Sequence, residues 1–252
     1  MLQRAAKLIT AASVTAIIFN FRNSSRNPQP TKEKISYPTS SEKEWESYYQ
    51  KTQNNSPDLV EPIYLEIVKK LEEQNPKKEL KALDLGTGTG VVALLAARGT
   101  KPKGEGCSFQ VIAEDMNRNA LDIVNERAKQ EDLQQCIRTR QRDLSNNSGP
   151  NEQYDLITAR SVLPFLPQDV SVKTIIEDNI SQKLATGGNA VIGFFGPRHP
   201  WCSTRQCHTK EEIQGFFSGF KRVEILDASE PTVLLASGKE SPWHQITAVA
   251  YK

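Results

Sequence analysis

The chain has 252 residues, of which 25% are charged, and a formal net charge of +2. This length allows one large α/β domain with a sizeable core, and the near-neutral charge gives no support to a nucleic-acid-binding surface. Three histidines and four cysteines over this length favour a reducing compartment rather than a disulfide framework.

Residues 1–41 differ in composition from the rest of the chain. Residues 8–21 are mostly apolar, basic residues flank them on both sides, and no acidic residue precedes Glu33. The stretch is shorter than the roughly 20 residues of a membrane-spanning helix. Three interpretations are open: a signal peptide, an organelle transit segment, or a membrane anchor or surface helix. The last is favoured because the apolar stretch is continuous.

The Pro-, Asn- and Ser-rich residues 23–41 indicate a flexible linker, so residues 42–252 are expected to form the folded domain. If residues 8–21 span a membrane, the larger number of basic residues on their C-terminal side leaves that domain in the cytoplasm. The expected location is therefore cytoplasmic, with membrane contact through residues 8–21.

The first predicted elements lead to a glycine-rich turn. Residues 44–49 contain three aromatic side chains and predict either a helix packed on the domain edge or a lid over a cofactor cleft. Residues 62–73 predict an amphipathic helix with a proline in its opening turn. The apolar run 81–85 predicts a strand, and Gly-Thr-Gly-Thr-Gly at residues 86–90 separates it from a predicted helix over 91–97.

A strand, a glycine turn and a helix form the nucleotide-binding opening of a doubly wound α/β sheet. Glycines allow the sharp turn and the close approach of a ligand. A dinucleotide fingerprint needs its third glycine at position 91, which is Val91 here. The observed Gly-x-Gly-x-Gly resembles motif I of the class I S-adenosylmethionine (SAM) methyltransferases, in which the turn packs against the amino-acid end of SAM. A dinucleotide-dependent oxidoreductase is an alternative, disfavoured by Val91 and by the lack of a second substrate domain.

Strand and helix patterns then continue to the C-terminus. Strands are predicted over 109–113, 136–141, 154–159, 189–195, 223–228 and 246–251, and helices over 120–129, 169–184 and 211–217. Asn117 is expected to cap the helix over 120–129, and Gly187-Gly188 to end the helix over 169–184. There is no internal repeat. This order predicts a Rossmann-like sheet.

Residues just after the first three strands predict the cofactor site, because ligands bind outside the carboxyl ends of strands in such sheets. Asp115 ends the second strand, where a carboxylate can accept from both hydroxyls of a ribose, and alternation turns Glu114 to the opposite face. Met116 either lies along adenine or fills space, and Asp143 either accepts from the adenine amino group or is an exposed loop acid. The residues predicted to hold SAM are Asp84, Gly86, Thr87, Gly88, Gly90, Asp115, Met116, Asp143, Leu144 and Ala159.

Motifs in the second half of the chain carry a closer resemblance. Leu163-Pro164-Phe165 follows the fourth predicted strand, residues 194–201 (Phe-Phe-Gly-Pro-Arg-His-Pro-Trp) follow the fifth, and Trp243-His244 precedes the last. From Trp45 to Lys252 the chain resembles the small bacterial methyltransferases grouped with the tellurite-resistance type. The resemblance implies a class I methyltransferase sheet, mostly parallel with an antiparallel C-terminal strand, SAM as methyl donor and a small-molecule acceptor. That family has an acid after the arginine, where this chain has His199, a departure on the substrate side.

The residues predicted to act on the substrate are Arg160, Arg198, His199 and His244. Arg198 either clamps an anionic substrate or forms a structural ion pair. Each histidine is either a base near neutral pH or a structural hydrogen-bonding group.

Two further readings gain little support. His199, Cys202, Cys207 and His208 are residue types that bind zinc, but no paired ligand set recurs, so no metal is predicted. The fourth strand is not followed by the Asn/Asp-Pro-Pro-aromatic motif of enzymes that methylate exocyclic or amide nitrogens, and no Pro-Cys dipeptide exists. No nucleic-acid partner is therefore expected.

The combined prediction is a SAM-dependent methyltransferase that acts on a small molecule, as a monomer or weak dimer. A SAM-binding sensor or scaffold without catalysis is the main alternative.

Overall fold

The computed structural model describes residues 62–76, 78–101, 105–145, 149, 151–234 and 240–252. The predictions for residues 1–41 and 44–49 lie outside this part of the chain. Among the helices of the described residues, none has the length and apolarity needed to cross a membrane.

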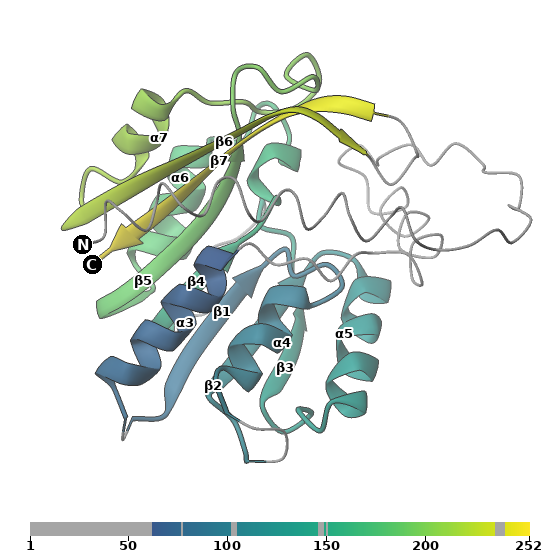
Figure 1. Cartoon of the computed structure of the whole chain (residues 1–252), viewed down its shortest axis with the longest axis vertical. Coiled ribbons are helices and arrows are strands. Elements are labelled where there is room, and N and C mark those ends of the chain that lie inside the picture. The colour runs from purple at the N-terminus through teal and green to yellow at the C-terminus, as the bar shows by residue number, and fades with distance from the viewer. Residues whose placement is uncertain (1–61, 77, 102–104, 146–148, 150, 235–239) are drawn as a thin grey trace, which may run out of the picture. The chain divides into compact units, whose positions relative to one another are not determined.

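The described residues form a seven-stranded sheet in the order β3-β2-β1-β4-β5-β7-β6 (Figure 1). β1 pairs in parallel with β2 and β4, β2 with β3, and β4 with β5. β7 is antiparallel to both β5 and β6. The strands are β1 Leu80–Leu85, β2 Phe109–Asp115, β3 Ile137–Gln141, β4 Tyr154–Ala159, β5 Leu184–Phe195, β6 Arg222–Leu234 and β7 Glu240–Tyr251. The predicted class I methyltransferase sheet with an antiparallel C-terminal strand is confirmed.

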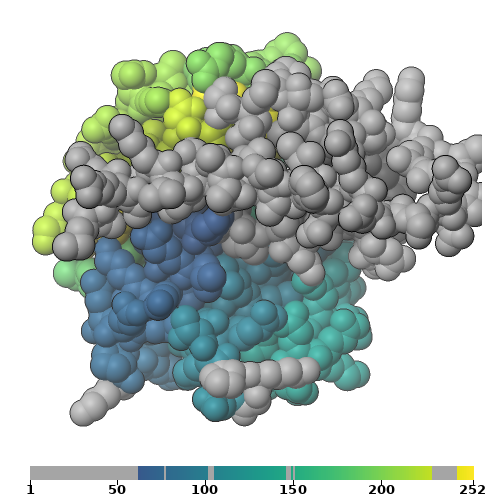
Figure 2. Space-filling model, viewed as in Figure 1, coloured from purple at the N-terminus to yellow at the C-terminus, as the bar shows by residue number. Residues whose placement is uncertain are grey.

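Helices cover both faces of the sheet (Figure 1). Their bounds are α3 Pro62–Gln74, α4 Val91–Arg98, α5 Arg118–Gln130, α6 Val172–Ile176 and α7 Lys210–Phe216. The blue and teal surface in the lower part of Figure 2 includes the side chains of α3, α4 and α5. Asn117 caps α5 as predicted, since its side chain accepts from the Ala120 amide at 3.2 Å.

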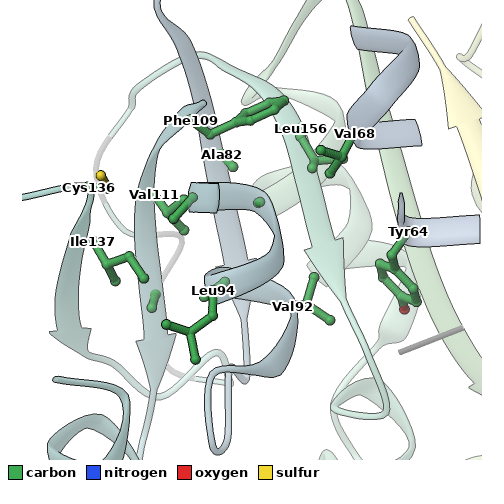
Figure 3. Packing of buried hydrophobic residues seen from close by; sticks show 14 of the residues in the cluster. Tyr64, Val68, Ala82, Val92, Leu94, Phe109, Val111, Cys136, Ile137 and Leu156 are labelled. Carbon is green, nitrogen blue, oxygen red and sulfur yellow. The ribbon is translucent and has the colours of Figure 1, made fainter. Parts of the chain in front are cut away.

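Alternation along β1 divides the core between the two faces of the sheet. Leu80 and Ala82 belong to a cluster with residues of α3 and α4, in which Figure 3 shows Val68 of α3 beside Leu156 of β4. Leu83 and Leu85 belong to the second cluster, with α6 and α7. Because both faces are buried, apolar residues occupy adjacent positions such as Ala82 and Leu83 instead of alternating with polar ones.

The segment before β5 differs from the prediction. The helix expected over 169–184 is α6 followed by a π-helical turn, Glu177–Ser181. Gly187 and Gly188 do not end it, because they lie within β5. The β4–β5 register shifts between Tyr154 and Leu156, and a Cβ at Gly188 would lie 2.9 Å from the Asp155 carbonyl oxygen. These glycines therefore permit the irregular pairing of β4 with β5.

The cysteine prediction is wrong. Cys107 is bonded to Cys136 and Cys202 to Cys207, and no cysteine among the described residues is free. Cys107 and Cys136 are separated by 29 residues but precede the neighbouring strands β2 and β3, so sheet topology brings them together. Disulfides persist in oxidising compartments and are rare in the cytosol. The cysteines therefore no longer support a reducing compartment.

Candidate functional site

A pocket lies where β1, β2, β3 and β4 end, which is the ligand-binding edge of a doubly wound sheet. Its lining comes from the turn after β1, the end of β2 and the loops after β3 and β4. The lining residues are Gly86, Asp115, Met116, Arg142, Asp143, Leu144, Ser145, Ser161, Val162, Phe165, Leu166 and Pro167.

The glycine turn is built from left-handed residues. Gly86, Gly88 and Gly90 have φ values of 64°, 54° and 80°, a region that disfavours residues with a Cβ. A Cβ at Gly86 would lie 2.4 Å from a methyl carbon of Val162. The first glycine thus lets the turn pack against the loop after β4, and these two segments form adjacent walls of the pocket.

Asp84 and Thr87 support the turn from behind and do not line the pocket. The Asp84 carboxylate, 3% exposed, accepts from the hydroxyls of Thr87 at 2.7 Å and Thr158 at 2.6 Å. Burial raises the pKa of Asp84 to about 6, against the effect of these two hydrogen bonds. This side chain therefore ties β1, the glycine turn and β4 together.

Asp115 lines the pocket and also fixes its backbone. Its carboxylate accepts from the Gly88 amide at 3.0 Å and the Asn117 amide at 2.9 Å, and burial raises its pKa. Each carboxylate oxygen has two lone pairs, so these bonds leave acceptor capacity for hydroxyl groups. Glu114 is fully buried and pairs with Arg140 and Arg142 instead.

The residues that follow β2 and β3 give the pocket a lining that is partly apolar and partly acidic. Met116 and Leu144 line it, together with Asp143. The Asp143 carboxylate accepts from the Ser145 amide at 2.8 Å and hydroxyl at 2.7 Å. The sequence analysis did not select Arg142, which also lines the pocket and donates to Asn179 of the π-helical turn at 2.8 Å. Its position directly before Asp143, just after β3, could have indicated that it lies at the pocket.

The loop after β4 forms another wall of the pocket, and in the sequence it could be recognised only as part of a family motif. Ser161 lies in the left-handed region with φ 56° and lines the pocket with Val162, Phe165 and the two residues after it. A non-glycine residue in that region is uncommon and often marks a functional site. Ala159 and Arg160, predicted to be site residues, precede this wall and are not part of the pocket lining.

The two histidines of the predicted catalytic set have ring nitrogens committed inside the protein. His244 Nδ1 accepts from the Arg198 amide at 3.1 Å, so its Nε2–H donates to Asp227 at 3.0 Å. His199 Nδ1 accepts from the Trp201 amide at 3.2 Å, and burial, with the nearby His244 charge, lowers the pKa of His199 to about 4. Neither residue lines the pocket. In these positions neither imidazole has a lone pair to act as a base.

An aromatic cluster connects these histidines to the pocket. Phe165 makes edge contacts with Phe195 at 5.7 Å and Trp201 at 6.2 Å between ring centroids. His199 stacks on Phe195 at 3.7 Å, and Trp243 packs 4.6 Å from His199. The Arg198 side chain does not line the pocket, and the residue is exposed.

The structure thus brings together Gly86, Asp115, Met116, Asp143 and Leu144 from the predicted cofactor set. Asp84, Thr87, Gly88, Gly90 and Ala159 lie in or beside the supporting turn and strands. The zinc reading fails because Cys202 and Cys207 are bonded to each other. No group of three or more metal-binding side chains occurs among the described residues.

Comparison with known proteins agrees with this geometry. Residues 82–188, from β1 to the start of β5, match a family model described as a methyltransferase domain. Residues 82–188 are therefore similar to methyltransferase domains. The match covers the glycine turn, Asp115, Asp143 and the wall after β4.

Similar proteins extend this finding. The chain is 33% identical over 111 residues to the release factor glutamine methyltransferase of Streptococcus pneumoniae, covering 44% of this chain and 36% of that protein. The chain therefore spans about a third of that relative's length. The structure of TehB from Haemophilus influenzae is similar with a TM-score of 0.58 and 20% identity, covering 82% of this chain and 67% of that one. Haemonchus contortus phospholethanolamine N-methyltransferase 2 has a TM-score of 0.59 and 16% identity, covering 84% and 57%.

The family match supports S-adenosylmethionine as the cofactor, and the pocket residues fit that molecule. A carboxylate that retains acceptor capacity, Asp115, suits two ribose hydroxyls. Met116 and Leu144 offer apolar contact to a planar base, and the Asp143 carboxylate suits an amino group. One pocket therefore provides the carboxylate acceptors and apolar contacts that a ribose and an adenine need.

Proposed function

We propose that the chain is a SAM-dependent methyltransferase that transfers a methyl group to a small-molecule acceptor. One observation carries the proposal: a single pocket is lined both by Gly86, Asp115 and Asp143 and by the mostly apolar wall after β4. The first set of residues suits the cofactor, and the wall leaves an apolar surface for an acceptor.

When bound, SAM supplies a methyl group already activated by its sulfonium. The protein then needs to align the acceptor in line and exclude water. Phe165, Leu166 and Pro167 provide an apolar wall for both tasks. Because Nδ1 of His199 and both ring nitrogens of His244 already form hydrogen bonds within the protein, we favour an acceptor that is anionic near neutral pH and needs no protein base.

A protein acceptor is the second candidate, since one relative is a release factor glutamine methyltransferase. Enzymes that methylate amide nitrogens carry an Asn/Asp-Pro-Pro-aromatic motif after the fourth strand. This chain has Ala159-Arg160-Ser161-Val162 there, so we rank the small-molecule acceptor first. A SAM-binding protein without catalysis is the third alternative.

A panel assay with methyl-labelled SAM tests the proposal. The panel contains an aryl phenolate, an alkyl thiol, a primary amine, an aryl carboxylate and a glutamine-containing peptide. We expect transfer to an anionic small molecule. Transfer to the peptide alone would show that the acceptor is a protein and not a small molecule. Binding of SAM without transfer to any member would favour the noncatalytic alternative.

A further inference from the structure

The pocket wall Phe165–Pro167 is held by a segment that follows β5. The wall lies in a short 3-10 turn, Leu163–Phe165, and the loop that leads to α6. Its two prolines, Pro164 and Pro167, have no amide hydrogen to donate. Within the segment the Val170 amide donates to the Pro167 carbonyl at 3.0 Å, and further donors come from elsewhere in the protein.

Gln206 provides these donors. Its side-chain amide donates to the Pro167 carbonyl at 2.6 Å and the Val170 carbonyl at 3.0 Å, with the Leu166 carbonyl 3.5 Å away. Its backbone amide donates to the Pro164 carbonyl at 3.1 Å. One residue thus contacts both ends of the wall.

The segment that carries Gln206 is itself anchored. A disulfide joins Cys202 to Cys207 on either side of Gln206. Cys207 forms a β-bridge with Phe195 at the end of β5, and the His208 amide donates to the Phe195 carbonyl at 2.9 Å. The Arg205 guanidinium also lies over the Phe165 ring at 5.0 Å. The wall is therefore connected through Gln206 to the central sheet.

We propose that Gln206 is a positioning residue for methyl transfer, which sets the acceptor side of the pocket through the carbonyl groups of the Leu166–Val170 segment. The proposal rests on the proposed function, because the wall is taken as the acceptor surface. Gln206 touches no reacting atom. Its effect is on the place of Phe165, Leu166 and Pro167, and small misplacements of a substrate-aligning surface reduce transfer strongly.

Amide hydrogen exchange in the full chain without cofactor tests the positioning directly. Gln206→Met keeps a side chain of similar length and removes the donor, whereas Gln206→Lys keeps a donor. We expect exchange of the Phe165, Leu166 and Val170 amides to become about tenfold faster in Gln206→Met, equivalent to the loss of about one hydrogen bond, and less so in Gln206→Lys. Unchanged exchange in Gln206→Met would overturn the proposal.

Two matched controls separate this effect from general destabilisation. Gln135 also donates its side-chain amide to a backbone carbonyl, that of Asp132 at 3.0 Å, but lies at the other end of the sheet. Gln135→Met should leave the exchange of the wall unchanged. The double variant C202S/C207S should speed exchange of the wall, whereas C107S/C136S should not. Equal effects of the two disulfide variants would contradict a specific role for the Gln206 segment.

A kinetic assay tests the effect of Gln206 on methyl transfer, with the panel compound that the wild type methylates as the acceptor. We expect Gln206→Met to lower kcat and kcat/KM for that compound about tenfold, because the acceptor is less well aligned, with the affinity for S-adenosylhomocysteine unchanged. A parallel loss of S-adenosylhomocysteine affinity would show that Gln206 supports only the fold. If the wild type methylates nothing, the proposed function fails, while the exchange result still decides the role of Gln206.

Discussion

At the scale of single residues, Asp115 combines two tasks in one carboxylate. It accepts from the amides of Gly88 and Asn117 and faces the pocket. Asp115→Asn keeps the shape but replaces one acceptor oxygen with a donor, so we expect S-adenosylhomocysteine to bind about tenfold to hundredfold more weakly, or 1–3 kcal/mol. Calorimetry measures this, with the exposed Asp122→Asn on α5 as control. Equal affinity for Asp115→Asn and the wild type would remove Asp115 from the site.

The lowered pKa of His199 predicts how the free energy of unfolding depends on pH. Burial lowers its pKa to about 4 from an ordinary 6.5, so between these values the unfolded chain binds a proton that the folded chain does not. The free energy of unfolding should therefore fall as pH falls through this range, with up to about 1.4 kcal/mol per pH unit due to His199. This contribution is fully present above pH 6.5 and lost as pH approaches 4.

Urea unfolding at pH 7 and pH 5 measures that contribution. In His199→Gln, whose side chain cannot gain a proton, the stability lost between the two pH values should be smaller than in the wild type. An identical loss in both proteins would show that His199 is not buried in its neutral form.

At the scale of elements, the glycine turn and the loop after β4 depend on each other. A Cβ at Gly86 would meet Val162 at 2.4 Å, whereas Gly106 has a similar positive φ and nothing within 4 Å of a Cβ. Gly86→Ala should lower the free energy of unfolding by about 1–3 kcal/mol more than Gly106→Ala, because overpacking adds to the shared backbone strain. Urea unfolding of both variants provides the comparison. Equal losses would mean that Val162 moves away without cost.

Secondary-structure elements could be predicted where residues close together in the sequence determine them. The strand over 81–85, the glycine turn and the Asn117 cap follow from apolar runs, left-handed glycines and a side chain that bonds its own backbone. The role of Gly187 and Gly188 did not follow, because it depends on the close approach of Asp155 in another strand. The disulfides were missed for the same reason, since strand order determines which cysteines meet.

At the scale of the whole molecule, the sequence motifs predicted the sheet and a pocket at the carboxyl ends of its strands, but not the hydrogen-bond partners of the histidines or of Gln206. Asp115 and Asp143 could be selected because each follows a strand at a known edge. His199 and His244 looked like bases by residue type, yet Nδ1 of each accepts from a backbone amide and the His244 Nε2–H donates to Asp227. Gln206 carries no sequence signal, because its importance comes from carbonyl groups about 40 residues away, including that of Leu166.

The domain boundary remains a prediction. A chain shortened to begin at Ser41 should have the same urea midpoint and S-adenosylhomocysteine affinity as the full chain, because residues 23–41 have the composition of a linker. The shortened chain should also leave the membrane fraction if residues 8–21 contact lipid. A much lower midpoint or weaker binding would assign the N-terminal residues to the fold.

The central claim, that this pocket holds SAM for methyl transfer, is tested most directly by calorimetric titration of the full chain with S-adenosylhomocysteine and, in parallel, with NAD. The account predicts one molecule of S-adenosylhomocysteine bound per chain in the micromolar range and no heat from NAD. Binding of NAD, or no binding of S-adenosylhomocysteine at millimolar concentration, would contradict it.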